Sequence, residues 1–322
     1  MNDSAANGSP RILVVRLGAM GDIIHTLPAV ATLKHSFPRS RITWAVDPKW
    51  TALLEGNPFI DAVAPVGRRS LADLLAARRL LRGLGVEIAI DFQGLLKSAI
   101  VASLARPEQI YGFHRSELRE RAAALFYSRY TQTQSAHVVD KNLELAQAAG
   151  AANLLRAFPL PPGKPEGELP AGPYVLACPL AGWGSKQWPL ENYGSLAMML
   201  QDELGLTLVL NGPPQARAVL ANVAGAWPHT SGISGLICAT RGAAAVIGLD
   251  SGPLHLADAL GRPGVGIFGP TDPARNGPYG NTIAVLRDQS ARTTYKRRVQ
   301  SDASMLGIAP EAVFHALKAR LS

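Results

Sequence analysis

The chain has 322 residues, enough for about two domains, and its 47% hydrophobic and 17% charged residues exclude a disordered protein. A formal net charge of +8 at pH 7 predicts attraction to an acidic partner: nucleic acid, an anionic membrane surface or a phosphorylated substrate. Residues 1–10 contain no apolar signal segment, and no apolar run approaches the ~20 residues of a membrane span, so we expect a soluble protein. Cys178 and Cys238 are too few for a secreted disulfide framework and are expected in the core of a cytosolic protein.

The first half of the chain alternates short β-forming runs with helical patterns. Residues 12–15 predict a buried strand, which a glycine-bearing turn joins to a helix over residues 23–37. Asp22 is expected at or beside the N-cap of that helix, where an aspartate often serves only as a cap. The functional alternative is a carboxylate on a rigid turn that accepts a proton from a bound alcohol. The same half carries predicted strands at residues 41–46, 62–66 and 87–91, and predicted helices at 49–54, 70–84, 96–104 and 137–149.

A second turn with polar side chains is predicted at residues 91–97, between a strand and a helix. The carboxyl ends of strands are where sites form in α/β proteins. Lys97 in this turn is either a ligand of an anionic acceptor or an ordinary surface lysine. The basic residues of the chain are otherwise scattered, except at Arg68-Arg69, Arg78-Arg79 and Lys296-Arg297-Arg298.

Residues 158–173 carry six prolines and three glycines, a composition that excludes a helix or a central strand and predicts a linker between domains. We therefore predict an N-terminal domain over residues 1–157 and a C-terminal domain over 174–322. The second domain repeats the α/β alternation, with strands at 174–178, 207–211, 245–249 and 265–268, and helices at 190–203, 216–225, 233–241, 253–260 and 310–321. The expected fold class is α/β, with two Rossmann-like, doubly wound domains in tandem that face a central cleft.

Residues 246–268 predict a strand, a turn, a helix and a second strand. Asp250 and Ser251 are expected to cap the helix, whose first turn would present backbone N–H groups and a positive dipole end to a phosphorylated ligand. His255 in that turn would add a donor to the same anion. The alternative is a solvated cap followed by a core helix.

Residues 181–189 follow the first strand of the second half and combine small residues with Lys186. The small residues would let the backbone approach a ligand, and Lys186 would bring a positive charge to the edge that carries Asp250. The alternative is a mobile loop with a solvated lysine.

Motifs for other chemistries fail or are missing. Residues 264–269 match G-x-G-x-x-G, but the match lies across a predicted strand instead of opening a helix, which disfavours an NAD-dependent oxidoreductase. The sequence has no Walker A motif, no G-x-S-x-G, no zinc pattern and no paired Asp-x-Asp. It also lacks a basic patch interleaved with aromatic residues. We expect no metal, no cofactor and no nucleic-acid partner.

Taken together, five motifs in this order resemble glycosyltransferase family 9, the ADP-heptose:lipopolysaccharide heptosyltransferases; they lie at residues 18–28, 91–99, 186–189, 250–255 and 268–273. The His-Thr-Leu-Pro form of the first motif is most similar to the heptosyltransferase I branch, which adds the first heptose to Kdo. The resemblance implies a GT-B fold, with the acceptor bound by the N-terminal half and the nucleotide-sugar by the C-terminal half. It also implies inversion without a metal.

The resemblance further implies a role for individual residues, with Asp22 as the general base on the acceptor hydroxyl. The implied donor-binding residues are Gly182, Lys186, Asp250, Ser251, Gly252 and His255. The implied acceptor-binding residues are Gly21, Lys97 and Arg119. The partners would be ADP-heptose and a lipid-linked Kdo acceptor at the inner-membrane surface, so the protein would be cytoplasmic and peripheral on the inner face of that membrane.

Three departures from the family pattern leave alternatives open. Residues 66–70 pass almost directly into a helix, Ala181-Gly182 stand where hydroxyl residues are common, and residues 212–217 contain no glutamate for a ribose. A related transferase with another nucleotide-sugar or acceptor therefore stays possible. A non-catalytic nucleotide-sugar binding protein is an alternative from another class, which Asp22 disfavours because binding alone needs no base.

Overall fold

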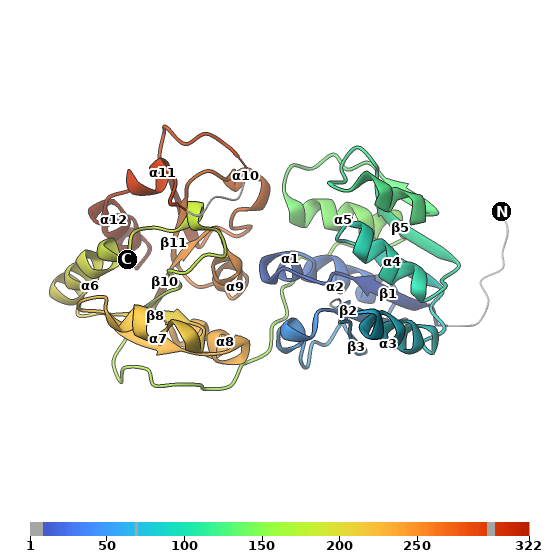
Figure 1. Ribbon diagram of the computed structural model, residues 1–322, viewed down its shortest axis with the longest axis horizontal. Helices are drawn as coiled ribbons and strands as arrows, with labels where there is room; N and C mark the ends of the chain where they lie inside the picture. The colour runs from blue at the N-terminus through green and yellow to red at the C-terminus, as the bar shows by residue number, and fades with distance from the viewer. Residues whose placement is uncertain (1–8, 68–69, 295–299, 322) are drawn as a thin grey trace. The chain divides into compact units, whose positions relative to one another are not determined.

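The computed structural model describes residues 9–67, 70–294 and 300–321. The chain divides into two compact units, Met1–Pro161 and Pro162–Ser322, and the division falls within the proline- and glycine-rich residues 158–173 (Figure 1). The basic pair Arg68-Arg69 and the run Lys296-Arg297-Arg298 lie outside the described residues.

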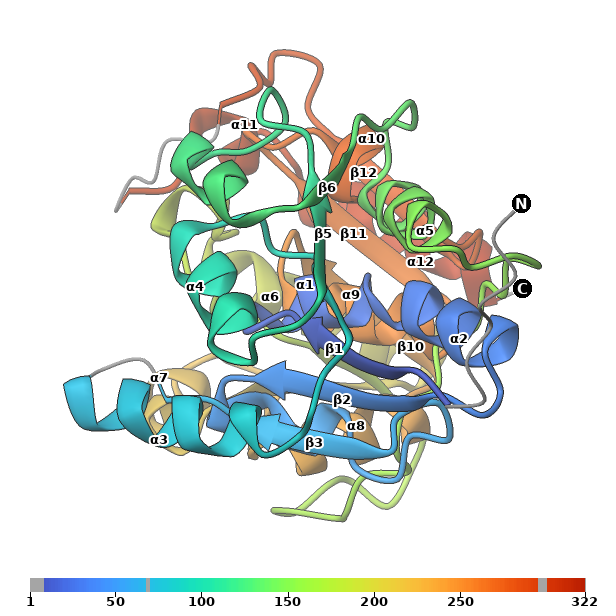
Figure 2. The same cartoon turned by 90° about the vertical axis from the view of Figure 1, so that its right-hand side faces the viewer.

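The first unit is built on a six-stranded sheet in the order β3-β2-β1-β4-β5-β6, in which every strand pair is parallel. Its strands are β1 (Arg11–Val15), β2 (Arg41–Val46), β3 (Ala62–Pro65), β4 (Ile88–Asp91), β5 (Gln109–Phe113) and β6 (Arg129–Thr131). Its helices are α1 (Met20–Ile24), α2 (Leu27–Ser36), η1 (Pro48–Leu53), α3 (Leu71–Arg82), α4 (Leu96–Leu104), η2 (Arg121–Phe126) and α5 (Val138–Ala148). Figure 2 shows these helices flanking the sheet.

The second unit has the same topology, with a parallel sheet in the order β12-β11-β10-β7-β8-β9. Its strands are β7 (Tyr174–Ala177), β8 (Thr207–Gly212), β9 (Trp227–Thr230), β10 (Ala245–Leu249), β11 (Gly264–Phe268) and β12 (Ile283–Arg287). Its helices are η3 (Gly184–Lys186), α6 (Leu190–Leu204), η4 (Pro214–Ala216), α7 (Arg217–Ala221), α8 (Ile233–Gly242), α9 (Gly252–Ala259), α10 (Pro273–Asn276), α11 (Ala303–Leu306) and α12 (Pro310–Leu321). Two doubly wound α/β units confirm the predicted fold class.

The central strands form because their sequences are apolar without interruption. In β1 the four residues after Arg11 are all buried, and in β10 all five residues are buried. Helices cover both faces of each sheet, so a strand in its middle needs no polar side. In each sheet the strand order reverses beside the unit's first strand, between β1 and β4 and between β7 and β10. Ligands of doubly wound proteins bind at the carboxyl ends of strands at this point.

Some predicted helices are interrupted or differ in type. The helix expected over residues 23–37 is two helices, α1 and α2, separated at His25 and Thr26. Pro28, the second residue of α2, has no N–H with which to continue the helical ladder of α1. The Thr26 hydroxyl instead donates to the carbonyl of Asp22 at 2.8 Å. The helix expected at 49–54 is the 3₁₀ helix η1, and the one expected at 216–225 is helical only in η4 and α7.

Four strands were not predicted, namely β5, β6, β9 and β12. Three of them lie at sheet edges, where short and partly polar sequences suffice. Strand β9 even contains Pro228, which a central strand would not tolerate because proline cannot donate to the ladder.

Part of the predicted linker belongs structurally to the second unit. The Glu166 carboxylate accepts hydrogen bonds from the backbone amides of Gly232 at 2.6 Å and Gly235 at 3.0 Å, at the start of α8. Both cysteines are free, and each is partly exposed instead of lying fully within the core as expected. Within the described ranges, the helices are too short or too polar to span a bilayer.

Candidate functional site

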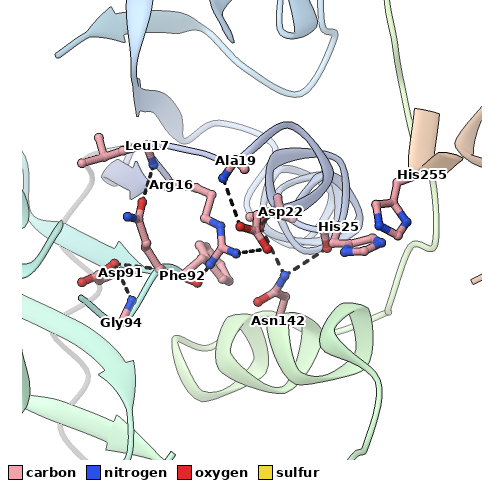
Figure 3. Close-up of polar contacts among 12 residues, drawn as sticks. Arg16, Leu17, Ala19, Asp22, His25, Asp91, Phe92, Gly94, Asn142 and His255 are labelled. Carbon is pink, nitrogen blue, oxygen red and sulfur yellow. Dashed lines mark hydrogen bonds and ion pairs between the residues drawn. The ribbon is translucent and has the colours of Figure 1, made fainter. Parts of the chain in front are cut away.

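Asp22 lies beyond the carboxyl end of β1, as the third residue of α1. Its Oδ2 accepts a hydrogen bond from the backbone amide of Ala19 at 3.0 Å, and its Oδ1 lies 2.7 Å from Nη2 of Arg16 (Figure 3). The N-cap residue is Ala19, so Asp22 stabilises the start of the helix by accepting a hydrogen bond from the N-cap amide. The Asp22 side chain is 36% exposed, which leaves the carboxylate accessible to a ligand.

Arg16 holds this carboxylate and is itself almost fully buried, with a side chain that is 8% exposed. Its Nη1 donates to the carbonyl oxygen of Phe92, and its own carbonyl accepts a hydrogen bond from the Trp44 indole at 3.1 Å. An arginine so fixed presents Nη2 to Asp22 in one orientation. We did not predict this role from the sequence, although a lone arginine directly after a buried apolar strand is a signal, because arginine is rarely buried without a partner.

The turn at residues 91–97 is organised by Asp91, which is completely buried. Its Oδ1 accepts hydrogen bonds from the backbone amides of Gln93 and Gly94, and its Oδ2 from the hydroxyls of Ser98 and Tyr127, both at 2.8 Å. Burial raises the pKa of Asp91 above its ordinary value, and the hydrogen bonds from Ser98 and Tyr127 offset this only in part. The residue is therefore a structural anchor of the turn.

This turn supports the Asp22 turn directly. Strand register places Val15 opposite Asp91, so the two turns leave the sheet side by side. The Gln93 side chain accepts a hydrogen bond from the backbone amide of Leu17 at 2.8 Å, and the carbonyl of Phe92 accepts one from Arg16 (Figure 3). The sequence placed the polar residues of this turn near a site, and the structure shows them holding the backbone that carries it.

The other residues predicted to bind an acceptor, Lys97 and Arg119, lie near the same sheet edge. Lys97 is exposed in the first turn of α4, and Arg119 is exposed in the segment between β5 and η2. The neighbouring Glu120 accepts a hydrogen bond from the backbone amide of Leu96 at 2.8 Å, which fastens the Arg119 segment to the start of α4. Gly21, in contrast, is buried within α1.

In the second unit, Lys186 and Asp250 meet at the carboxyl edge of the sheet. Lys186 Nζ lies 2.5 Å from Oδ2 of Asp250 and 4.4 Å from the centroid of the Trp183 ring. Thr271 donates its hydroxyl to the same Oδ2 at 2.6 Å, and Nε2 of His255 lies 3.8 Å from Oδ1. Asp250 is 9% exposed. Its carboxylate is therefore occupied by Lys186 and Thr271, and it holds the lysine ammonium in place.

Thr271 was not predicted as a site residue, although it lies in the motif at residues 268–273, which begins at the end of β11. The capping prediction was wrong in its detail. Ser251 occupies the N-cap position of α9, but its hydroxyl donates to the Leu249 carbonyl at 3.3 Å instead of accepting from the helix. Gly252 begins α9, so its first turn offers backbone donors at the positive end of the helix dipole. Gly182 is exposed, and a Cβ there would meet open space.

Comparison with known proteins shows a family match and the same architecture. The pattern of glycosyltransferase family 9 (heptosyltransferase) matches residues 74–305. Lipopolysaccharide heptosyltransferase 1 of Escherichia coli K12 is 27% identical over 307 residues, which cover 86% of this chain and 93% of that protein.

Two solved structures of E. coli heptosyltransferase WaaC are similar over 96% of this chain and 99% of theirs, at 25% identity. The one with ADP has a TM-score of 0.78, and the one with ADP-2-deoxy-2-fluoro heptose has a TM-score of 0.76. The two doubly wound units are thus those of a GT-B fold.

Proposed function

The chain belongs to glycosyltransferase family 9, the heptosyltransferases, and we propose that it transfers heptose from ADP-heptose to the Kdo of the lipopolysaccharide inner core. We propose further that the transfer inverts the anomeric carbon and needs no metal. The observation that carries this proposal is the accessible Asp22 carboxylate, fixed by Arg16 and the Ala19 amide at the carboxyl end of β1. The similarity to lipopolysaccharide heptosyltransferase 1 supports the acceptor, and the relative solved with ADP supports the donor nucleotide.

In the proposed reaction Asp22 is the general base. As the acceptor hydroxyl oxygen bonds to the anomeric carbon, its proton passes to the Asp22 carboxylate and the bond between that carbon and the ADP oxygen breaks. A single displacement of this kind inverts the anomeric centre. A positioned base typically contributes ~10²–10⁴-fold to the rate. Arg16 keeps the carboxylate in one orientation. The base is therefore already positioned when the weakly acidic hydroxyl of the acceptor binds.

The leaving diphosphate gains negative charge as the bond breaks. Lys186 and the backbone donors in the first turn of α9 supply positive potential at one edge of the second sheet. His255 lies in the same turn of α9. Fixed donors and charges of this type stabilise a developing anion because they need no reorganisation during the reaction. They provide the function that a metal ion serves in other transferases.

A phosphorylated, lipid-linked acceptor fits the charge of the protein. The net charge is +8, and the exposed Lys97 and Arg119 lie on neighbouring segments at the sheet edge that carries Asp22. We place the protein at the cytoplasmic face of the inner membrane as a peripheral protein, because a Kdo acceptor on a lipid resides in that surface.

The test is a transfer assay with ADP-heptose and a Kdo-bearing lipid acceptor, with the product detected by mass spectrometry. Asp22→Asn should lower kcat by at least ~10²-fold, while the affinity for ADP in calorimetry stays unchanged. Asp61→Asn is the matched control, because Asp61 is also 36% exposed and ion-paired, with Lys34 at 2.8 Å, but precedes β3 at the opposite edge of the same sheet. Undiminished turnover by Asp22→Asn would refute the assignment of Asp22 as the general base. Wild-type transfer from another nucleotide-sugar but not from ADP-heptose would refute the donor.

A further inference from the structure

Helix α3 (Leu71–Arg82) exposes leucines and arginines on one side. Ala77 and Leu81 point inward, since they are buried in the core of the first unit at 3% and 0% exposure. Leu74 and Leu75, by contrast, are 40% and 62% exposed. A single exposed leucine is ordinary on a protein surface. Leu74 and Leu75, however, are adjacent, and the packing of α3 does not need them because Ala77 and Leu81 already supply its buried side.

The arginines continue the same surface along the helix. Leu74, Arg78 and Arg82 are spaced four residues apart, as are Leu75 and Arg79, and side chains at this spacing stand above one another on a helix. All three arginines are exposed. These five residues define the α3 face, with leucines in the first half of the helix and arginines in the second half.

The charge of the α3 face is strongly positive. Arg106 and Arg78 act electrostatically on Arg82, so a further basic residue lies near the last turn. The acidic residue of the helix, Asp73, accepts a hydrogen bond from the backbone amide of Ser70 at 3.2 Å, at the opposite end. Within the described part of the chain these three arginines form no ion pair, so their charges are available to an anionic partner.

A surface that combines exposed leucines with a cationic cluster fits one kind of partner. Nucleic acid is bound mainly through phosphate contacts, which would engage the arginines but would not bury the leucines. An anionic bilayer satisfies both groups, because leucines enter the boundary between head groups and acyl chains while arginines pair with lipid phosphates. Helix α3 packs on its inner side against α4 and β3 and lies at the periphery of its sheet (Figure 2).

We propose that the α3 face docks the protein on an anionic lipid bilayer, with Leu74 and Leu75 inserted and Arg78, Arg79 and Arg82 on the head groups. This inference rests on the proposed function in one respect, since a lipid-linked acceptor lies in such a surface. It adds the part of the molecule that makes the contact.

The first test measures binding of the full chain to vesicles of phosphatidylcholine with and without phosphatidylglycerol. The wild type should float with the anionic vesicles, and Leu74→Gln/Leu75→Gln should weaken this binding by about tenfold or more through lost apolar burial. Met198→Gln is the matched control, because Met198 is 57% exposed on α6 of the second unit, and it should bind like the wild type. Absence of wild-type binding, or equal binding by the leucine variant, would overturn the proposal.

The second test removes charge. Arg78→Gln/Arg79→Gln/Arg82→Gln should lower binding by about fivefold per arginine at low salt, hence about 100-fold in total. The control removes the same net charge elsewhere by replacing the exposed Arg39, Arg217 and Arg320 with glutamine, and it should lower vesicle binding much less. Binding that falls with the arginines but not with the leucines would indicate a general polyanion surface and would overturn the membrane assignment.

A third measurement does not depend on polar substitutions. The wild type has five tryptophans and sets the background. Relative to it, the fluorescence added by Leu75→Trp should be quenched by brominated lipid in anionic vesicles and that added by Met198→Trp should not, and equal quenching of both would contradict insertion of α3. Transfer to a detergent-solubilised acceptor separates this inference from the proposed function. Variants of the α3 face should retain transfer in detergent and lose it on vesicles. A wild type that binds vesicles through α3 but transfers no heptose would refute only the function.

Discussion

Replacing Arg16 by methionine tests whether this nearly buried arginine positions the proposed base. The substitution keeps much of the buried stem but removes the guanidinium that lies 2.7 Å from Asp22. Without this partner the carboxylate retains one fixed contact, the Ala19 amide at 3.0 Å, and can rotate about it. Displacement of a catalytic group by ~1 Å can cost ~10²-fold in rate, so we expect kcat to fall by about that factor.

The stability of the variant follows from the second contact of Arg16. The carbonyl of Phe92 loses a buried donor, which costs about 1–3 kcal/mol in the free energy of unfolding. In a unit of this size each kcal/mol lowers Tm by roughly 2–4 °C. Turnover must therefore be measured well below the Tm of the variant and per mole of folded enzyme. Affinity for ADP, measured by calorimetry, should not change, because the groups proposed for the donor lie in the second unit.

Arg11→Met is the matched control, at the first residue of the strand that Arg16 directly follows. Arg11 also contacts a backbone carbonyl, that of Gly85, and a carboxylate, that of Glu87 at 2.8 Å, but its side chain is 50% exposed. An exposed pair is worth about 0–1 kcal/mol, so this variant should keep the kcat and nearly the Tm of the wild type. Arg16→Lys, which restores a charge but not the fork, should be intermediate. Wild-type kcat in Arg16→Met would refute the positioning role, and so would equal losses in both methionine variants.

Other predictions concern the donor site, metal use and stability. Lys186→Ala should weaken ADP binding in calorimetry by about 10–100-fold, because a charge-assisted contact is worth about 1.5–3 kcal/mol; an equal loss of acceptor affinity would argue against a diphosphate clamp. Transfer should survive excess EDTA, and loss that magnesium restores would contradict a metal-free mechanism. Gly112→Ala should lower the free energy of unfolding by about 1–3 kcal/mol or more, because its Cβ would lie 2.2 Å from the Tyr127 ring. Tyr127→Phe removes a hydrogen bond to Asp91 and should cost about 1.5–3 kcal/mol, visible in chemical denaturation; unchanged stability would contradict the anchoring role of Asp91.

The sequence allowed the central strands to be predicted because a strand covered on both faces must be apolar throughout. The runs in β1 and β10 have this property, and the structure confirms both as strands. Edge strands carry no comparable signal, since one side of the ladder meets solvent, and β6 and β9 were missed for this reason. The break between α1 and α2 was missed because the apolar spacing continues across it while Pro28 interrupts the hydrogen bonds.

The glycine pattern at residues 264–269 was correctly set aside, and the structure gives the reason for it. A Cβ at Gly264 would lie 2.3 Å from the carbonyl oxygen of Val246, and one at Gly266 would lie 3.0 Å from the Leu254 side chain. These glycines therefore serve close packing of β11 against β10 and α9. A sequence pattern does not separate this use of glycine from close approach to a phosphate, because both need the same missing Cβ.

The sequence placed Asp22 and Asp250 at the ends of strands, but it did not show that each pairs with a cation. Arg16 holds Asp22, and Lys186 holds Asp250, so each unit pairs a basic side chain with an aspartate at the carboxyl edge of its sheet. Exposure separates their roles. Asp22 is 36% exposed beside its nearly buried arginine, whereas Lys186 and Asp250 are only 14% and 9% exposed and the Asp250 carboxylate is already shared with Thr271. In the first unit the nearly buried Arg16 fixes the orientation of an accessible carboxylate, whereas in the second unit both partners of the ion pair are largely buried. Sequence spacing cannot supply this distinction, because it depends on how deeply the fold buries each member of the two pairs.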